Sequence, residues 1–132
     1  MPEQDIEEVW AEPLPGACPP RDATAPPMVD FFRLVSALPV SEGDFLSQRA
    51  LSPRRRLRNV SECVMRSVSL FCELSAVREI QKFPYFQGKL IIRFRLTPAA
   101  GLVSAPSSRS HVSWWRRQGH LPDSPVQEQA AP

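Results

Sequence analysis

The fold class follows from one stretch, LSAVREIQKFPYFQGKLIIRFRL, at residues 74–96. Its first part repeats apolar side chains at three-residue spacing, which predicts a helix with a single apolar stripe. The stripe consists of Leu74, Val77, Ile80 and Phe83. Ser75 is the predicted cap, and Pro84 ends the pattern. Residues 88–96 then alternate with period two, which predicts a strand. The stretch therefore predicts one helix followed by one strand.

The two faces of the predicted strand differ in character. The expected core-facing residues are Leu90, Ile92, Phe94 and Leu96. The expected outer residues are Lys89, Ile91, Arg93 and Arg95. The strand is therefore predicted to bury one side and to carry positive charge along the other.

Shorter patterns on both sides of this stretch predict the remaining elements. Further strands are expected at residues 28–36, 67–71, 102–103 and 111–115. Asp44 is a candidate cap for a short helix over residues 45–50, and Ser61 for another over 61–65. A single helix from Ser61 to Cys72 is the alternative to a strand at 67–71. Together these patterns predict an α+β fold with a small antiparallel or mixed sheet and one or two short helices.

Composition predicts a single ordered domain between two loose ends. Residues 1–27 hold seven of the 15 prolines and six of the 14 acidic residues, which predicts a disordered acidic arm. Residues 28–115 form the predicted domain, and residues 116–132 have the composition of a loose tail. A body of this size has a modest core, so a homodimer or a bound partner would stabilise it.

Charge is distributed unevenly and suggests a partner. Residues 1–30 hold seven acidic residues and one basic residue, whereas residues 31–117 hold fifteen basic and five acidic residues. A basic body favours an acidic protein or a polyanion, and binding without catalysis is the first functional hypothesis. The candidate binding residues are Arg54, Arg55, Arg56, Arg58, Arg93, Arg95, Trp114, Trp115, Arg116 and Arg117.

Each part of this predicted face has a structural alternative. The arginines at 54–58 can equally be a solvated charge run. Tryptophan beside arginine is typical of interaction hot spots, but one tryptophan can instead close the core while the other lies at its rim.

Cysteine and histidine usage predicts neither a disulfide framework nor a metal site. Cys18, Cys63 and Cys72 are odd in number and contain no close pair, so free cysteines and a cytoplasmic location are expected. His111 and His120 lack the close ligand spacing of structural zinc sites. No run approaches the roughly 20 apolar residues of a membrane span, so no membrane contact is expected.

The order of several short motifs resembles two groups of proteins. The motifs are F-x-R at 31–33, S-x-S-x-F at 67–71, L-T-P-x-x-G at 96–101 and H-x-S-W-W at 111–115. Their layout is similar to a group of short bacterial proteins of unassigned function, which implies no established activity. More distantly, it resembles ADP-ribosyltransferase-type domains.

The second resemblance implies a nucleotide site. Arg33 would bind the phosphate of a nicotinamide dinucleotide (NAD), and the strand containing Ser69 would shape the nicotinamide pocket. The chain departs from that family because no glutamate lies on a late strand; only Asp123 and Glu128 follow Glu79. The resulting alternative is an NAD-binding, ADP-ribosyltransferase-like domain, either active or degenerate through the missing glutamate.

Two site residues have further interpretations. His111 could transfer protons to or from Ser69 if the two side chains meet, so Arg33, Ser69 and His111 form the alternative catalytic set. Arg33 could instead be an edge-strand arginine whose stem reaches water. No cofactor is expected under the first functional hypothesis.

Overall fold

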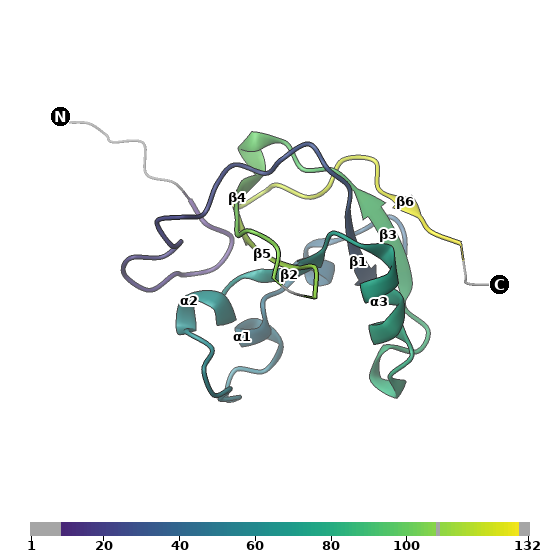
Figure 1. Ribbon diagram of the computed structural model, residues 1–132, viewed down its shortest axis with the longest axis horizontal. Coiled ribbons are helices and arrows are strands. Elements are labelled where there is room, and N and C mark those ends of the chain that lie inside the picture. The colour runs from purple at the N-terminus through teal and green to yellow at the C-terminus, as the bar shows by residue number, and fades with distance from the viewer. Residues whose placement is uncertain (1–8, 108, 130–132) are drawn as a thin grey trace.

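The computed structural model describes residues 9–107 and 109–129. These residues form a six-stranded antiparallel sheet in the order β4-β5-β2-β1-β3-β6 (Figure 1). The strands are β1 Phe31–Val35, β2 Val68–Phe71, β3 Leu90–Phe94, β4 Gly101–Val103, β5 His111–Arg116 and β6 Val126–Gln127. The helices are α1 Gln48–Leu51, α2 Glu62–Met65 and α3 Leu74–Gln81, with 3-10 turns η1 Glu42–Phe45, η2 Pro84–Phe86 and η3 Pro98–Ala100. The α+β prediction is confirmed.

Strand pairing explains how the main core forms. Strands β1 and β3 pair antiparallel from Phe31 opposite Phe94 to Val35 opposite Leu90. This register brings the alternating apolar residues of both strands to the same face. The main core comprises Phe31, Val35, Phe45, Val68, Leu70, Ile92, Phe94, Leu96, Ala100, Val103, Val112 and Trp114. The predicted core face of the strand at 88–96 is therefore confirmed.

A second, smaller core lies beneath α3 on the other face of the sheet. It consists of Phe32, Val77 and Ile91, with Leu34, Phe71 and Leu74 packed against it. The predicted helical stripe supplies Val77 and Leu74 to this core, whereas Ile80 is not part of it and Phe83 is 60% exposed. The prediction that Phe83 is buried is wrong because α3 ends at Gln81 and Pro84 begins a new turn.

Helix caps differ in part from those predicted. Ser61 caps α2 by accepting a hydrogen bond from the Val64 amide, as predicted. In contrast, Ser47 caps α1 through the Ala50 amide, so Asp44 is not its cap. Helix α3 begins after Glu73, which excludes Ser75 as its cap. No helix among the described residues is long and apolar enough to cross a membrane.

Both chain ends contact the sheet within the described residues. Trp10 forms a bridge with Arg117, and Thr24 forms one with Val103 at the outer strand β4. Residues 9–27 thus differ from the predicted disordered arm, whereas residues 1–8 lie outside the described part. The segment after β5 differs in the same way, because β6 pairs with β3. A prediction from proline content cannot include these contacts, because they are made with residues far away in the sequence.

Candidate functional site

A cleft of about 420 Å³ lies where β1 and β2 separate. The two strands share one paired position, Phe32 opposite Phe71, and residues of both strands line the cleft beyond it. Part of the lining comes from η1 and α1, and another part comes from the end of α3 and from η2. The volume lies within the range of about 300–1,000 Å³ that is typical of small-molecule sites.

Arg33 is the partly buried cation of this cleft. Its Nε donates to the Asp44 carbonyl at 2.7 Å, its Nη1 to the Ser69 carbonyl at 2.6 Å and its Nη2 to the Leu46 carbonyl at 3.4 Å. The guanidinium carbon also lies 5.6 Å from the centre of the Phe45 ring. Burial lowers the pKa of Arg33 to about 10, and the charge of Asp44 offsets only part of that effect.

No carboxylate of the described residues forms an ion pair with Arg33. The nearby Asp44 carboxylate instead accepts the backbone amides of Ser36 and Ser41, each at 3.0 Å. The interpretation of Arg33 as an edge-strand arginine is wrong, because β1 lies between β2 and β3. A positive charge is therefore held in the cleft by neutral carbonyl groups.

Ser69 and His111 meet on the same face of neighbouring strands. His111 lies opposite Phe71, and Ser69 is two residues before Phe71, so their side chains are diagonal neighbours. The His111 Nε2 and the Ser69 Oγ are 3.0 Å apart. The imidazole packs edge-on against the Phe71 ring, with 5.6 Å between ring centres. Burial lowers the pKa of His111, which favours the neutral ring at neutral pH.

Aromatic side chains and a lysine complete the cleft lining. Phe83 and Tyr85 are 60% and 76% exposed, and Phe86 lies edge-on to Tyr85. Lys89 lines the same cleft, and its Nζ donates to the Ser36 hydroxyl at 3.0 Å. Sequence reasoning did not assign these residues to a site, although three aromatic residues at 83–86 could have indicated one.

The predicted tryptophan-containing face is not present as such. Trp114 and Trp115 are 0% and 1% exposed, so neither indole ring can stack on a partner. Trp114 belongs to the main core, and the Nε1 of Trp115 donates to the Cys63 carbonyl. The prediction failed because alternation places the two rings on opposite faces, and both faces are covered.

The predicted basic residues fall into two groups. Several are paired: Arg93 with Asp30 and Glu128, Arg95 with Asp30, Arg116 with Glu42, and Arg117 against the Trp10 ring. The other four, Arg54, Arg55, Arg56 and Arg58, are exposed, and none of them has an ion-pair partner among the described residues. The ten residues predicted to share one face therefore do not do so, and the four arginines at 54–58 are the exposed members of the set without an ion-pair partner among the described residues.

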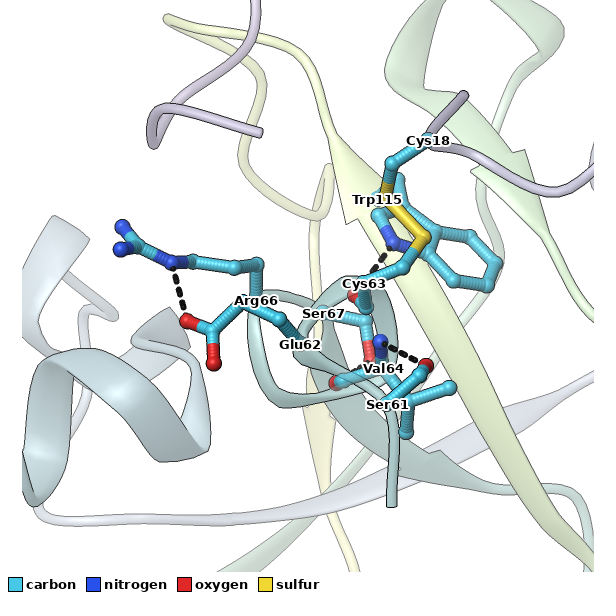
Figure 2. The surroundings of a disulfide bond; sticks show 8 residues. All are labelled: Cys18, Ser61, Glu62, Cys63, Val64, Arg66, Ser67 and Trp115. Atoms are coloured by element: carbon cyan, nitrogen blue, oxygen red, sulfur yellow. Dashed lines mark hydrogen bonds and ion pairs between the residues drawn. A yellow bond between two sulfur atoms is a disulfide. The ribbon is translucent and has the colours of Figure 1, made fainter. Parts of the chain in front are cut away.

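The cysteine prediction is wrong for two of the three residues. Cys18 and Cys63 form a disulfide across 45 positions of sequence (Figure 2). Cys72 is free. An odd cysteine count does not exclude one long-range bond. Residues 9–107 and 109–129 contain no group of three or more histidine, cysteine, aspartate or glutamate side chains suited to a metal ion.

The lowered pKa of His111 predicts a pH dependence of stability. Below its usual pKa of 6.5, the unfolded chain binds a proton that the folded chain takes up less readily. The free energy of unfolding should therefore fall as pH decreases through this range, and His111→Gln should flatten that fall. Urea unfolding between about pH 5 and pH 8 measures it. If the free energy of unfolding depends on pH equally in the wild type and in His111→Gln, then His111 is not the group responsible.

Comparison of the chain with protein-family models, curated proteins and solved structures finds no match. The two resemblances drawn from the motifs therefore stay predictions.

Proposed function

We propose that the protein binds a small anionic ligand with a planar ring, of the nucleotide type, in the cleft around Arg33. The observation that carries the proposal is the Arg33 charge, which is partly buried in the cleft lining and has no ion-pair partner among the described residues. Burying an unpaired charge is costly, and an incoming anion would offset part of that cost. Lys89 and a protonated His111 would add to the attraction.

The aromatic lining favours a ligand with a ring as well as an anion. Phe83 and Tyr85 expose most of their surface beside the cleft, and exposed rings of this kind stack on planar groups. The hydrogen-bonded Ser69 and His111 pair offers polar atoms that can fix the ligand's orientation. NAD, which the resemblance to ADP-ribosyltransferase-type domains implies, combines both features.

Binding without turnover fits the groups that line the cleft. Asp44 is the only carboxylate among the lining residues, and backbone amides already occupy it. His111 and Ser69 can exchange a proton, but no carboxylate in the described contacts orients the imidazole. We therefore propose a binding role for Arg33, Ser69 and His111 and no catalytic one.

A thermal-stability assay tests this function. NAD and adenosine monophosphate should raise the melting temperature, because a ligand at about 100 times its Kd stabilises the folded state by about 2.7 kcal/mol. Adenosine, which has the same ring but no phosphate, should have a much smaller effect. Arg33→Gln should weaken binding of the monophosphate by about tenfold or more, since hydrogen bonds to a charged group contribute about 1.5–3 kcal/mol.

Two further variants protect this test against misfolding of Arg33→Gln. Lys89→Gln removes a cleft charge outside the main core and should also weaken binding. Arg95→Gln removes an exposed charge that does not line the cleft and should leave binding unchanged. Equal stabilisation by adenosine and its monophosphate would refute the proposal.

The exposed arginines at 54–58 favour a second candidate function, binding of an acidic protein or a polyanion. Arg54 and Arg56 line a polar surface depression together with Arg49 and Arg66, which share the Glu62 carboxylate. Binding of a single-stranded oligonucleotide should weaken with salt, with a log–log slope of up to about −3 for four contacts. Replacing all four arginines by glutamine should remove it, and a flat salt response would point to a protein partner instead.

The disulfide bears on the proposed location. The bond removes the free-cysteine argument for the cytoplasm, and a cytoplasmic location requires the bond to be transient, as disulfides in that compartment usually are. We propose the cytoplasm on that condition. Alkylation of free thiols before cell lysis measures the fraction of Cys18–Cys63 that is oxidised. Complete and permanent oxidation would place the protein in an oxidising compartment.

A further inference from the structure

The N-terminal segment 9–18 is fastened to the body at both ends. At one end the Ala11 amide donates to the Arg116 carbonyl at 2.9 Å, and at the other the Cys18–Cys63 disulfide joins the segment to α2 (Figure 2). Trp10 and Leu14 of the segment line a small space of about 10 Å³ together with Trp115, which is 1% exposed, so the segment covers the Trp115 ring.

The same segment reaches the wall of the cleft through Glu12. The Glu12 carboxylate accepts hydrogen bonds from both the backbone amide and the hydroxyl of Ser47. Ser47 is 0% exposed and is the N-cap of α1. Helix α1 contributes Gln48 and Leu51 to the cleft lining. A chain of direct contacts therefore runs from the disulfide, along segment 9–18, to the residues that line the cleft.

Helix α1 depends on this support. It has four residues, and none of them is buried. A helix this short is not stable by itself in water, so its position depends on the contacts at its ends. Loss of Glu12 would leave Ser47 buried with its amide unpaired and would weaken the hold on the α1 wall.

We propose that the Cys18–Cys63 disulfide is a redox switch for the cleft, in which reduction frees segment 9–18, withdraws Glu12 from Ser47 and loosens the α1 wall. The proposal rests on the proposed ligand-binding function only for its effect on affinity. A dithiol reductant supplies the electrons: one of its thiolates attacks a cysteine sulfur, and its second thiol resolves the mixed disulfide. Cys18 and Cys63 become two thiols while the reductant becomes a disulfide.

Amide hydrogen exchange of the full chain, with and without dithiothreitol, tests the switch. Reduction should increase exchange at residues 47–51 while β1, β3 and β5 keep their protection, and the fluorescence of the uncovered Trp115 should change. Glu12→Gln should raise exchange at 47–51 even in the oxidised protein. Cys72→Ser, which leaves the disulfide intact, should respond to reductant as the wild type does.

Ligand titration completes the test. Adenosine monophosphate should bind the reduced protein about fivefold or more weakly, the lower end of typical coupling between sites. Equal affinity in both states, or unchanged exchange at 47–51, would overturn the switch while leaving the proposed function intact. Loss of protection throughout the sheet would also overturn it, because the bond would then maintain the whole fold. If no nucleotide binds the oxidised protein, the proposed function fails and the exchange result alone decides the switch.

Discussion

Replacing Trp114 with alanine should lower the free energy of unfolding by about 3–5 kcal/mol. The side chain is 0% exposed, lies in the main core and packs edge-on against Phe45, with 6.0 Å between ring centres. Its Nε1 also donates to the Ala100 carbonyl at 3.1 Å, so the substitution removes that partner and leaves a cavity. Urea unfolding followed by far-ultraviolet circular dichroism measures the loss.

Tyr85→Ala is the matched control for Trp114→Ala. Tyr85 is also a large aromatic residue but is 76% exposed, so its removal should change stability by no more than about 0.5 kcal/mol. A loss below about 1 kcal/mol for Trp114→Ala would mean that the indole is not the centre of the core.

Replacing both Cys18 and Cys63 with serine should lower the free energy of unfolding by about 4 kcal/mol. The bond joins positions 45 residues apart, and closing a loop of this length in the unfolded chain removes much of its conformational entropy. Guanidinium unfolding under non-reducing conditions measures the difference. Cys72→Ser should retain the stability conferred by the bond, since Cys72 is free.

Identical unfolding of the two proteins would contradict this second prediction. If the double serine variant and the wild type unfold at the same denaturant concentration with the same slope, the two cysteines are not bonded in solution. A double variant that binds adenosine monophosphate as the oxidised wild type does would also argue against the proposed switch.

Local patterns predicted the elements whose signal lies within a few residues. The alternation at 88–96 gave the core face of β3, because side chains on a strand follow a strict period of two. Ser61 was identified as a cap because its bond to Val64 spans only three residues. Phe83 shows the limit of such patterns: the helical stripe continued in the sequence, but the helix did not.

Contacts between distant residues could not be predicted from the sequence. The pairing of Cys18 with Cys63 depends on where segment 9–18 lies, and no local pattern gives that position. The burial of Trp115 could not be predicted for the same reason. Alternation along β5 places its ring on the face away from the main core, and residues of segment 9–18 cover it there.

The candidate site was only partly predictable. Arg33, Ser69 and His111 were singled out individually, but their convergence depends on the strand order β5-β2-β1. The gap between β1 and β2 that the guanidinium occupies likewise results from tertiary structure, since it appears only when the strands are assembled. The residue types therefore indicated which chemical groups are available, whereas the cleft that brings them together results from the strand order.

The central claim, that an anion binds beside Arg33 and His111, is tested most directly by the pKa of His111 itself. Proton NMR can follow the ring signals of both histidines across a pH titration with saturating adenosine monophosphate and, separately, with adenosine. A phosphate in the cleft should raise the pKa of His111, because a nearby negative charge favours the imidazolium form. His120 does not line the cleft, so its ring signals should not respond to the monophosphate. A His111 titration that is the same with and without the monophosphate would contradict the account.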